Sequence, residues 1–327
     1  MKRINKRVCF VSALLTCALT LSACGGAKPR YAYGVDMQGS PFNLNSELHE
    51  ASYLEPFAVS LCVTDGNVAN EKVLADEGVE AEGLFDLNAR EALYARNVFG
   101  TVYPASITKV MTALVALKYG STDKMMTASA NVKITETGAQ LAGIKEGDQM
   151  TMDQALHLLL LYSANDAAIM IAEDVGGSVA GFCEMMNEEA KRIGATGTNF
   201  TNPNGLTEEA HYTTAYDLYL IFAEAVKYER FNEIISLTSY ATTYHDAAGR
   251  EKEIKFNTTN GYISGTYAQP AGITVLGGKT GTTNAAGHCL ILYSKDTSGN
   301  PYISVVMSAD STDELYRDMT NLLEAVY

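Results

Sequence analysis

Basic residues, histidines and paired cysteines are all scarce in this sequence. Its 24 Lys and Arg stand against 38 Asp and Glu, for a net charge of −14. This balance argues against a nucleic-acid partner, because phosphate binding needs a basic face. The five histidines fit no Ser-His-Asp arrangement, and we interpret His157 and His211 as structural. No CxxC or HExxH spacing provides metal ligands, so we expect no metal and no cofactor.

The six cysteines do not form a disulfide framework. Cys9 and Cys17 lie in the apolar N-terminal segment, and Cys24 ends it. The other three are odd in number and show no paired spacing. We therefore expect buried free thiols at Cys62, Cys183 and Cys289.

The N-terminal apolar run is too short to span a bilayer comfortably, since a span needs about 20 residues. A basic "MKRINKR" precedes "VCFVSALLTCALTL", and "LSAC" follows with small residues. This pattern predicts a secretory signal peptide over residues 1–23. "LSAC" also resembles the bacterial lipobox, in which the cysteine, here Cys24, is lipidated and begins the mature protein. A secreted protein with a chance cysteine is the alternative.

A lipid on Cys24 would hold the protein at the membrane without a transmembrane helix. We therefore expect it on the extracytoplasmic face of the bacterial cell membrane. Residues 24–55 are polar, with scattered Gly, Pro, Asn and Ser, and we interpret them as a flexible tether. Residues 56–327 show no repeat or second-domain boundary and form the predicted folded domain.

Strand-like segments at both ends of the folded region flank a helical middle. Strands are expected over 57–64, 82–97 (two strands around a turn), 273–283, 287–296 and 300–310. Helices are expected behind Ser106, over 151–177 (two helices that meet near Ser163), and over 178–195, 213–228 and 312–327. The pattern predicts an α/β protein of the α+β kind. One antiparallel sheet, made from N- and C-terminal strands, packs with a central helical cluster.

The stretch "PASITKVMTALVALKYG" places Ser106 and Lys109 at the start of an apolar helix. Residues i and i+3 share a helix face, and the positive helix end favours a developing alkoxide. Lysine becomes a base only when burial or a second cation lowers its pKa. The same S-x-x-K spacing recurs at Ser121 and Lys124, where no apolar run follows, and we interpret that copy as a turn.

An S-x-N pattern occurs three times, and only one copy lies between two apolar helices. That copy is Ser163-Ala164-Asn165, where polar side chains must be buried or face a cleft. The copy at Ser298 is typical of a hairpin turn, and the copy at Ser129 lies in a polar stretch.

The stretch "GGKTGTT" contains Lys279, Thr280 and Gly281 on a predicted strand. Alternation places Lys279 and Gly281 on one face and Thr280 on the other. The glycines allow a ligand to approach the backbone closely, which a plain solvated edge strand would not require.

In order and spacing, these three motifs resemble those of penicillin-binding proteins and serine β-lactamases. "YPASITKVMTALVAL" and "TNPNGL" further resemble the low-molecular-mass D-alanyl-D-alanine carboxypeptidases, over roughly residues 80 to 327. The resemblance implies a β-lactamase/transpeptidase-like fold and a penicillin-binding DD-peptidase domain. It also implies removal of the terminal D-alanine from peptidoglycan stem pentapeptides that end in D-Ala-D-Ala, and covalent inhibition by β-lactam antibiotics.

The resemblance implies catalytic roles for three residues. Ser106 attacks the carbonyl between the two D-alanines and forms an acyl-enzyme, and Lys109 takes its proton. Ser163 passes a proton to the leaving D-alanine. The backbone N–H groups of Ser106 and Thr282 form the oxyanion hole.

The resemblance assigns substrate binding to five further positions. Asn165 binds the base and the substrate amide, and Lys279 assists the proton relay and supplies positive charge. Thr280 and Thr282 lie on the strand that binds the substrate backbone and its terminal carboxylate, with Gly281 between them.

The motifs depart from many family members at two positions, with Ala164 in place of glycine and Asn204 in place of histidine. We also expect the chain to lack the second, β-rich domain and the C-terminal amphipathic helix of many relatives. A transpeptidase or endopeptidase with the same residues is one alternative. A class A β-lactamase would need an E-x-x-x-N loop, and the corresponding region has only Glu208 and Glu209. A non-catalytic penicillin-binding wall lipoprotein would show a broken motif.

Overall fold

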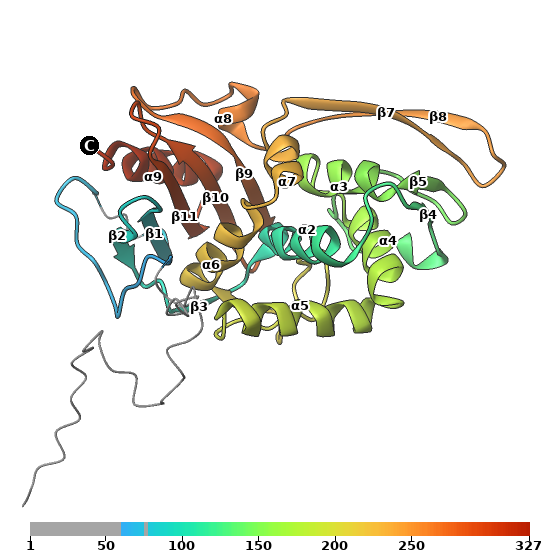
Figure 1. The fold of residues 1–327 in the computed structure, drawn as a ribbon, viewed down its shortest axis with the longest axis horizontal. Helices are drawn as coiled ribbons and strands as arrows, with labels where there is room; N and C mark the ends of the chain where they lie inside the picture. The colour runs from blue at the N-terminus through green and yellow to red at the C-terminus, as the bar shows by residue number, and fades with distance from the viewer. Residues whose placement is uncertain (1–59, 75–77) are drawn as a thin grey trace, which may run out of the picture. The chain divides into compact units, whose positions relative to one another are not determined.

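A five-stranded antiparallel sheet joins strands from the two ends of the folded chain (Figure 1). The structure is a computed structural model that describes residues 60–74 and 78–327. Along the sheet the order is β2 (Glu91–Arg96), β1 (Ala81–Asp86), β11 (Pro301–Ala309), β10 (Gly287–Lys295) and β9 (Thr274–Thr283). The predicted α+β architecture is confirmed, because β1 pairs directly with β11.

The remaining elements lie mostly between β2 and β9 in the sequence. The helices are α2 (Thr108–Tyr119), α3 (Met152–Leu161), α4 (Asn165–Gly176), α5 (Val179–Ile193), α6 (Ala215–Ala225), α7 (Glu229–Ile235), α8 (Gly261–Ser264) and α9 (Thr312–Glu324). Two 3-10 turns are η1 (Ala105–Ile107) and η2 (Ala130–Val132). A two-stranded sheet pairs β3 (Thr101–Val102) with β6 (Thr213–Thr214), and a four-stranded sheet contains β4 (Met125–Thr127), β5 (Gln149–Thr151), β7 (Ser239–His245) and β8 (Glu251–Asn257).

Both faces of the five-stranded sheet are buried, and the strand alternation decides which residues face which layer. On β11, Ile303, Val305 and Met307 join the core that contains α2 and α6. The intervening Val306 joins a second core formed with α9. The near-continuous apolar run in β11 thus follows from two covered faces.

Helix α2 is the centre of the helical cluster. Its residues from Thr108 to Ala116 are all buried, as expected for a helix that is apolar on all sides. The surrounding helices have defined ends: Thr214 caps α6, and Gly194 ends α5 in the left-handed conformation at φ 88°. The thiols of Cys62, Cys183 and Cys289 are free and buried, as predicted. Most of the helices and strands expected from the sequence are present.

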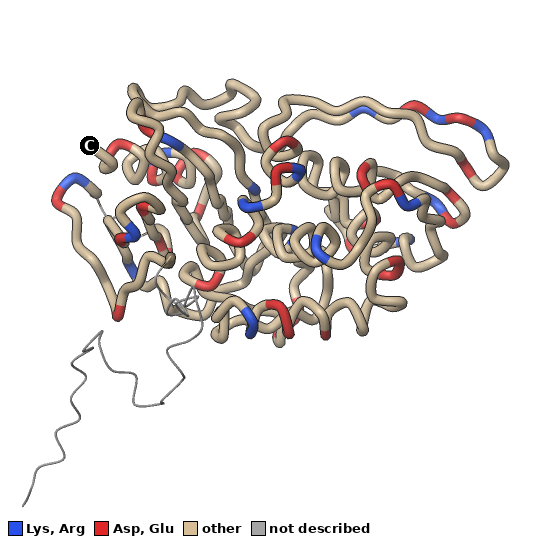
Figure 2. The backbone as a smooth tube through the Cα atoms, viewed as in Figure 1, with Lys and Arg blue, Asp and Glu red and all other residues tan. Residues whose placement is uncertain are grey.

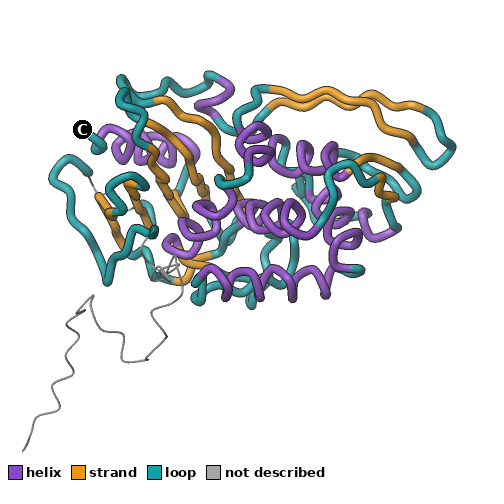
Figure 3. Tube along the Cα trace, in the orientation of Figure 1, coloured by secondary structure: helices purple, strands orange, loops and turns teal. Residues whose placement is uncertain are grey.

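Two parts of the fold differ from the sequence expectations. A strand was expected over 57–64, but residues 60–64, the described part of this range, do not form one. The hairpin of β7 and β8 was not expected; it extends beyond the helices in Figures 1 and 3 and carries many charges in Figure 2. Its strands are largely solvent-exposed, and the inward-facing positions are few: Tyr240, Thr242 and Tyr244 on β7, with Ile254 and Phe256 on β8. The apolar alternation is therefore too short to indicate a strand in the sequence.

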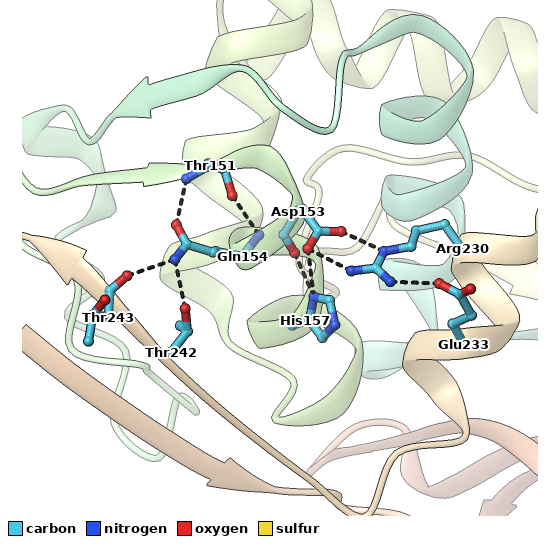
Figure 4. A network of polar contacts seen from close by, with 8 residues as sticks. All are labelled: Thr151, Asp153, Gln154, His157, Arg230, Glu233, Thr242 and Thr243. Carbon is cyan, nitrogen blue, oxygen red and sulfur yellow. Dashed lines mark hydrogen bonds and ion pairs between the residues drawn. The ribbon is translucent and has the colours of Figure 1, made fainter.

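The start of α3 ties this hairpin and α7 to the helical cluster (Figure 4). Thr151 and Gln154 form a capping box, and the Gln154 Nε2 also donates to Thr242 Oγ1 and Thr243 O of β7 at 2.7 Å each. Asp153 accepts two hydrogen bonds from the Arg230 guanidinium of α7, a strong bidentate geometry.

His157, on the next turn of α3, is buried and stacks on Tyr240 at 3.9 Å between ring centroids. Its Nδ1 donates to the Asp153 carbonyl at 2.7 Å. These contacts support the interpretation of His157 as structural.

Within the described part of the chain, no helix has both the length and the apolar character needed to cross a membrane. The predicted signal peptide, the lipidation site Cys24 and the tether 24–55 lie outside the described residues, and the domain boundaries remain predictions.

Candidate active site

Ser106 lies on a tight turn directly before α2, where it is half-buried. The preceding Ala105 has φ 46°, a left-handed conformation that is costly for a residue with a side chain. Gly205 packs against this turn so closely that an added Cβ would overlap the Ala105 carbonyl. The turn is therefore held from outside, and it fixes the position of Ser106.

Lys109 is completely buried one turn further along, and its Nζ has three hydrogen-bond contacts. It lies 2.8 Å from Ser106 Oγ, 2.8 Å from Asn165 Oδ1 and 2.5 Å from the carbonyl oxygen of Asn204. The last two oxygens can only accept, so they take two N–H groups of the amine. Only the Ser106 hydroxyl can also donate. A neutral Lys109 thus has all its partners satisfied while its lone pair faces the Ser106 hydroxyl.

The surroundings favour that neutral form. Burial is the main cause that lowers the pKa of Lys109 well below 10.5, and the positive charge of Lys279 lowers it further. The Asp166 carboxylate acts in the opposite direction but does not dominate. Desolvation and a like charge together are the conditions under which a lysine can serve as a base near neutral pH.

Ser163 connects the second lysine to the site. It occupies the break between α3 and α4 with φ 66°, and its Oγ accepts a hydrogen bond from Lys279 Nζ at 3.0 Å. Lys279 also donates to the Thr280 carbonyl at 2.8 Å. Burial lowers the pKa of Lys279 to about 7.

Strand β9 runs beside the turn that carries Ser106. A side chain at Gly281 would meet the backbone nitrogens of Ser106 and Ile107 at 3.0 and 3.2 Å, closer than most Cβ atoms come to their neighbours. Lys279 and Gly281 are buried and Thr282 is exposed, which is the alternation that the sequence predicts. Glycine thus allows the strand to approach the turn closely.

A cleft of about 710 Å³ opens over these groups. The motif residues among those that line it are Ser106, Ser163, Asn165, Thr280, Gly281 and Thr282. All eight motif residues named from the sequence are therefore at one site, in the cleft or directly below it. The described residues contain no group of three or more His, Cys, Asp or Glu that could hold a metal ion.

Several groups that support the site were missed by the sequence analysis. Asn204 contributes its backbone carbonyl, which no side-chain pattern reveals. The buried carboxylate of Asp166 accepts from the N–H groups of Ala142, Gly143 and Ile144 at 2.8 to 3.0 Å, although burial raises its pKa. It thereby holds the segment whose Gln140 carbonyl accepts from the Asn165 N–H at 2.9 Å. The position of Asp166 next to the S-x-N motif is the only signal that could have indicated it.

His211 is part of the framework below the cleft. Its Nδ1 accepts from the Thr201 N–H at 3.1 Å, so its Nε2–H donates to Thr108 Oγ1 at 2.8 Å. Burial lowers its pKa to about 4, which keeps the ring neutral. These contacts support the structural interpretation of His211.

The fold and this group of two serines, two buried lysines and an asparagine define the class of DD-peptidase and β-lactamase-like proteins. The chain belongs to the D-alanyl-D-alanine carboxypeptidase family, Peptidase S11, whose model matches residues 71–311.

Individual relatives agree with this assignment. The chain is 33% identical over 270 residues to the D-alanyl-D-alanine carboxypeptidase DacF of Bacillus subtilis, a match that covers 80% of this chain and 65% of that protein. The chain thus spans just under two thirds of that relative. The crystal structure of the Streptomyces K15 DD-transpeptidase superposes with a TM-score of 0.71 at 24% identity, over 79% of this chain and 98% of that one. Penicillin-binding protein D2 of Listeria monocytogenes, in its cefotaxime-bound form, gives 0.64 at 25% identity, over 77% and 98%.

Replacement of Lys109 by arginine tests its role as the base. Arginine retains a positive charge but does not lose a proton in proteins, so we expect the rate of acylation by a labelled penicillin to fall by about 10²–10⁴-fold. The matched control is Lys118→Arg, at a half-buried position on the same helix where the side chain pairs with Glu189 at 2.7 Å; it should acylate at the wild-type rate. Lys109→Met should lose acylation as well, and thermal melting should show both Lys109 variants folded. A folded Lys109→Arg variant that acylates at nearly the wild-type rate would contradict this role.

Proposed function

We propose that this protein is a serine-type D-Ala-D-Ala carboxypeptidase that removes the terminal D-alanine from peptidoglycan stem pentapeptides. The observation that carries the proposal is the buried Lys109 amine, whose two acceptor-only partners leave its lone pair for Ser106. Family membership supports the substrate class. β-Lactam antibiotics are proposed as covalent inhibitors that acylate the same serine.

In the first half-reaction, the Ser106 proton passes to Lys109 as Oγ bonds to the carbonyl carbon of the penultimate D-alanine. The negative charge on the carbonyl oxygen is stabilised by the backbone N–H groups of Ser106 and Thr282. The C–N bond then breaks, and Ser163, hydrogen-bonded to Lys279, gives a proton to the leaving nitrogen while the proton held by Lys109 passes to Ser163. The net result is one acyl-enzyme, one free D-alanine and transfer of the serine proton to that amine.

In the second half-reaction, a water molecule attacks the ester carbon and the bond to Ser106 Oγ breaks. A proton returns to the serine, and the shortened peptide leaves as a carboxylate. If an amine took the place of water, the same site would act as a transpeptidase. Cleavage at a cross-link instead of a free chain end would make it an endopeptidase, and rapid hydrolysis of a β-lactam ester would make it a β-lactamase.

The nucleophile assignment predicts a specific loss of activity. Ser106→Ala should lower D-alanine release from a pentapeptide by about 10³-fold or more, because no acyl-enzyme forms. It should also abolish covalent labelling by a fluorescent penicillin. Ser121→Ala is the matched control, since Ser121 starts the second S-x-x-K sequence but lies in an exposed turn, and it should retain full activity. D-Alanine release by Ser106→Ala at the control rate would refute the proposal.

The same assay separates the related activities. Slow release of the penicillin label together with free D-alanine indicates the carboxypeptidase, whereas rapid turnover of the β-lactam indicates a β-lactamase. An added acceptor amine that enters the product indicates a transpeptidase. Labelling of Ser106 without any turnover of peptide indicates a non-catalytic binding protein.

We further propose that the protein is a lipoprotein, anchored through Cys24 at the extracytoplasmic face of the cell membrane. The support is the basic head, apolar run and "LSAC" exit of the N-terminal sequence. Lipidation would keep the domain near newly made cell wall without a spanning helix.

Fractionation of a bacterial host tests the anchor. The wild-type chain should pellet with membranes and be released by detergent, whereas Cys24→Ala should lose this association because no lipid can be attached. Cys17→Ala, within the apolar run, is the matched control and should fractionate as the wild type. Equal membrane association of the Cys24 and Cys17 variants would argue against lipidation at Cys24.

A further inference from the structure

The active-site cleft has little positive charge for a substrate that ends in a carboxylate. Among the described residues that line it, none is lysine or arginine, Glu136 is acidic, and His288 alone can become a cation. The Lys279 side chain lies below the surface at 1% exposure, with Ser163 Oγ and the Thr280 carbonyl as its partners. A chain with a net charge of −14 also gives no general attraction for an anion.

His288 lies where it can reach such an anion. It is the second residue of β10 and is paired in register with Thr282 of β9, so the two side chains are on the same face of the sheet. Its Nδ1 is 3.5 Å from Thr282 Oγ1 and 3.1 Å from Thr312 Oγ1. Both threonines and His288 line the cleft. Three elements, β9, β10 and α9, thus bring one imidazole and two hydroxyls together.

The hydrogen-bonding capacity of this group fits a carboxylate. A carboxylate accepts only, and the threonine hydroxyls and the imidazole can each donate. When the Thr312 hydroxyl donates to Nδ1, the ring carries its proton on Nε2, which has no hydrogen-bond partner among the described residues. A protonated ring would donate from both nitrogens and add a charge, and hydrogen bonds to charged groups are the stronger ones.

We propose that His288, oriented by Thr312 and adjacent to Thr282, binds the C-terminal carboxylate of the substrate and thereby selects peptides with a free chain end. The inference rests on the proposed D-Ala-D-Ala carboxypeptidase function. It adds a residue that no sequence motif indicated, and it makes His288 a determinant of exo- over endo-cleavage. Thr312 is a positioning residue, because it acts through the imidazole.

The test compares two substrates that differ only at the chain end. One peptide ends in D-Ala-D-Ala with a free carboxylate, and the other carries the same end as an amide. Wild-type protein should prefer the acid. His288→Ala and His288→Gln should lower the ratio of kcat/KM for acid over amide by about tenfold, mainly through a higher KM for the acid. His288→Arg should restore much of the preference because the guanidinium supplies N–H donors and a permanent positive charge.

Two further variants make the test specific. Thr312→Val removes the hydroxyl that contacts Nδ1 but leaves the helix cap Ser311 intact, and it should reduce the preference partly. His245→Ala, an exposed histidine at the end of β7, is the matched control and should leave the preference unchanged. Stoichiometric labelling by a saturating penicillin verifies that each variant has an intact nucleophile.

The outcomes are distinguishable from failure of the proposed function. If the wild type is labelled but releases no D-alanine from the acid, the carboxypeptidase proposal fails. If the wild type is active and prefers the acid, an equal loss on both substrates in the His288 variants would show a purely structural role and overturn the inference. An unchanged preference in both His288→Ala and His288→Gln would overturn it as well.

Discussion

The contact between the buried Lys109 amine and the Ser106 hydroxyl is the interaction on which the rest of the site depends. An ammonium group removed from water is strongly disfavoured unless it is paired, and in practice such a group gives up its proton. Here the nearest partners are an amide oxygen and a carbonyl oxygen, which satisfy N–H groups but supply no negative charge. These surroundings therefore favour the neutral amine of Lys109, which can act as a base, over the protonated ammonium form.

Much of the fold serves to hold that arrangement in place. Helix α2 is buried almost throughout and fixes Lys109 at its start, while the packed β9 strand lies against the Ser106 turn. Ala105 and Ser163 both adopt left-handed backbone conformations. Strain of this kind persists only where the surroundings over-determine it, and both residues lie within the catalytic constellation. The rigid sheet and helical cluster provide those surroundings.

The sequence predicted the side-chain chemistry of the site better than its supporting contacts. Ser106, Ser163 and Lys279 could be found because each motif lies at a recognisable break or strand, and the three occur in a fixed order. The Asn204 carbonyl could not be found, because a backbone group leaves no trace in residue identity.

The fold, like the site, was predicted in part. The strong periodicity of buried strands and amphipathic helices predicted the main sheet and most helices. The strand expected over 57–64 was wrong for its described part, 60–64. There only Cys62 is buried, and its N–H donates to the Tyr219 hydroxyl instead of to a neighbouring strand. The β7–β8 hairpin was missed because its strands are largely exposed and β8 carries charged residues on both faces. His288 was missed because its role depends on the pairing register of two strands and on the start of α9.

The most direct measurement of the central claim is an NMR titration of the Lys109 amine in the folded protein, with the signal assigned by comparison with Lys109→Arg. Burial and Lys279 should give Lys109 a pKa well below 10.5, and Lys279→Met should raise that pKa because a like charge is removed. A pKa at or above 10.5 in the wild type would contradict the account, since Lys109 would then be a cation and could not take the Ser106 proton.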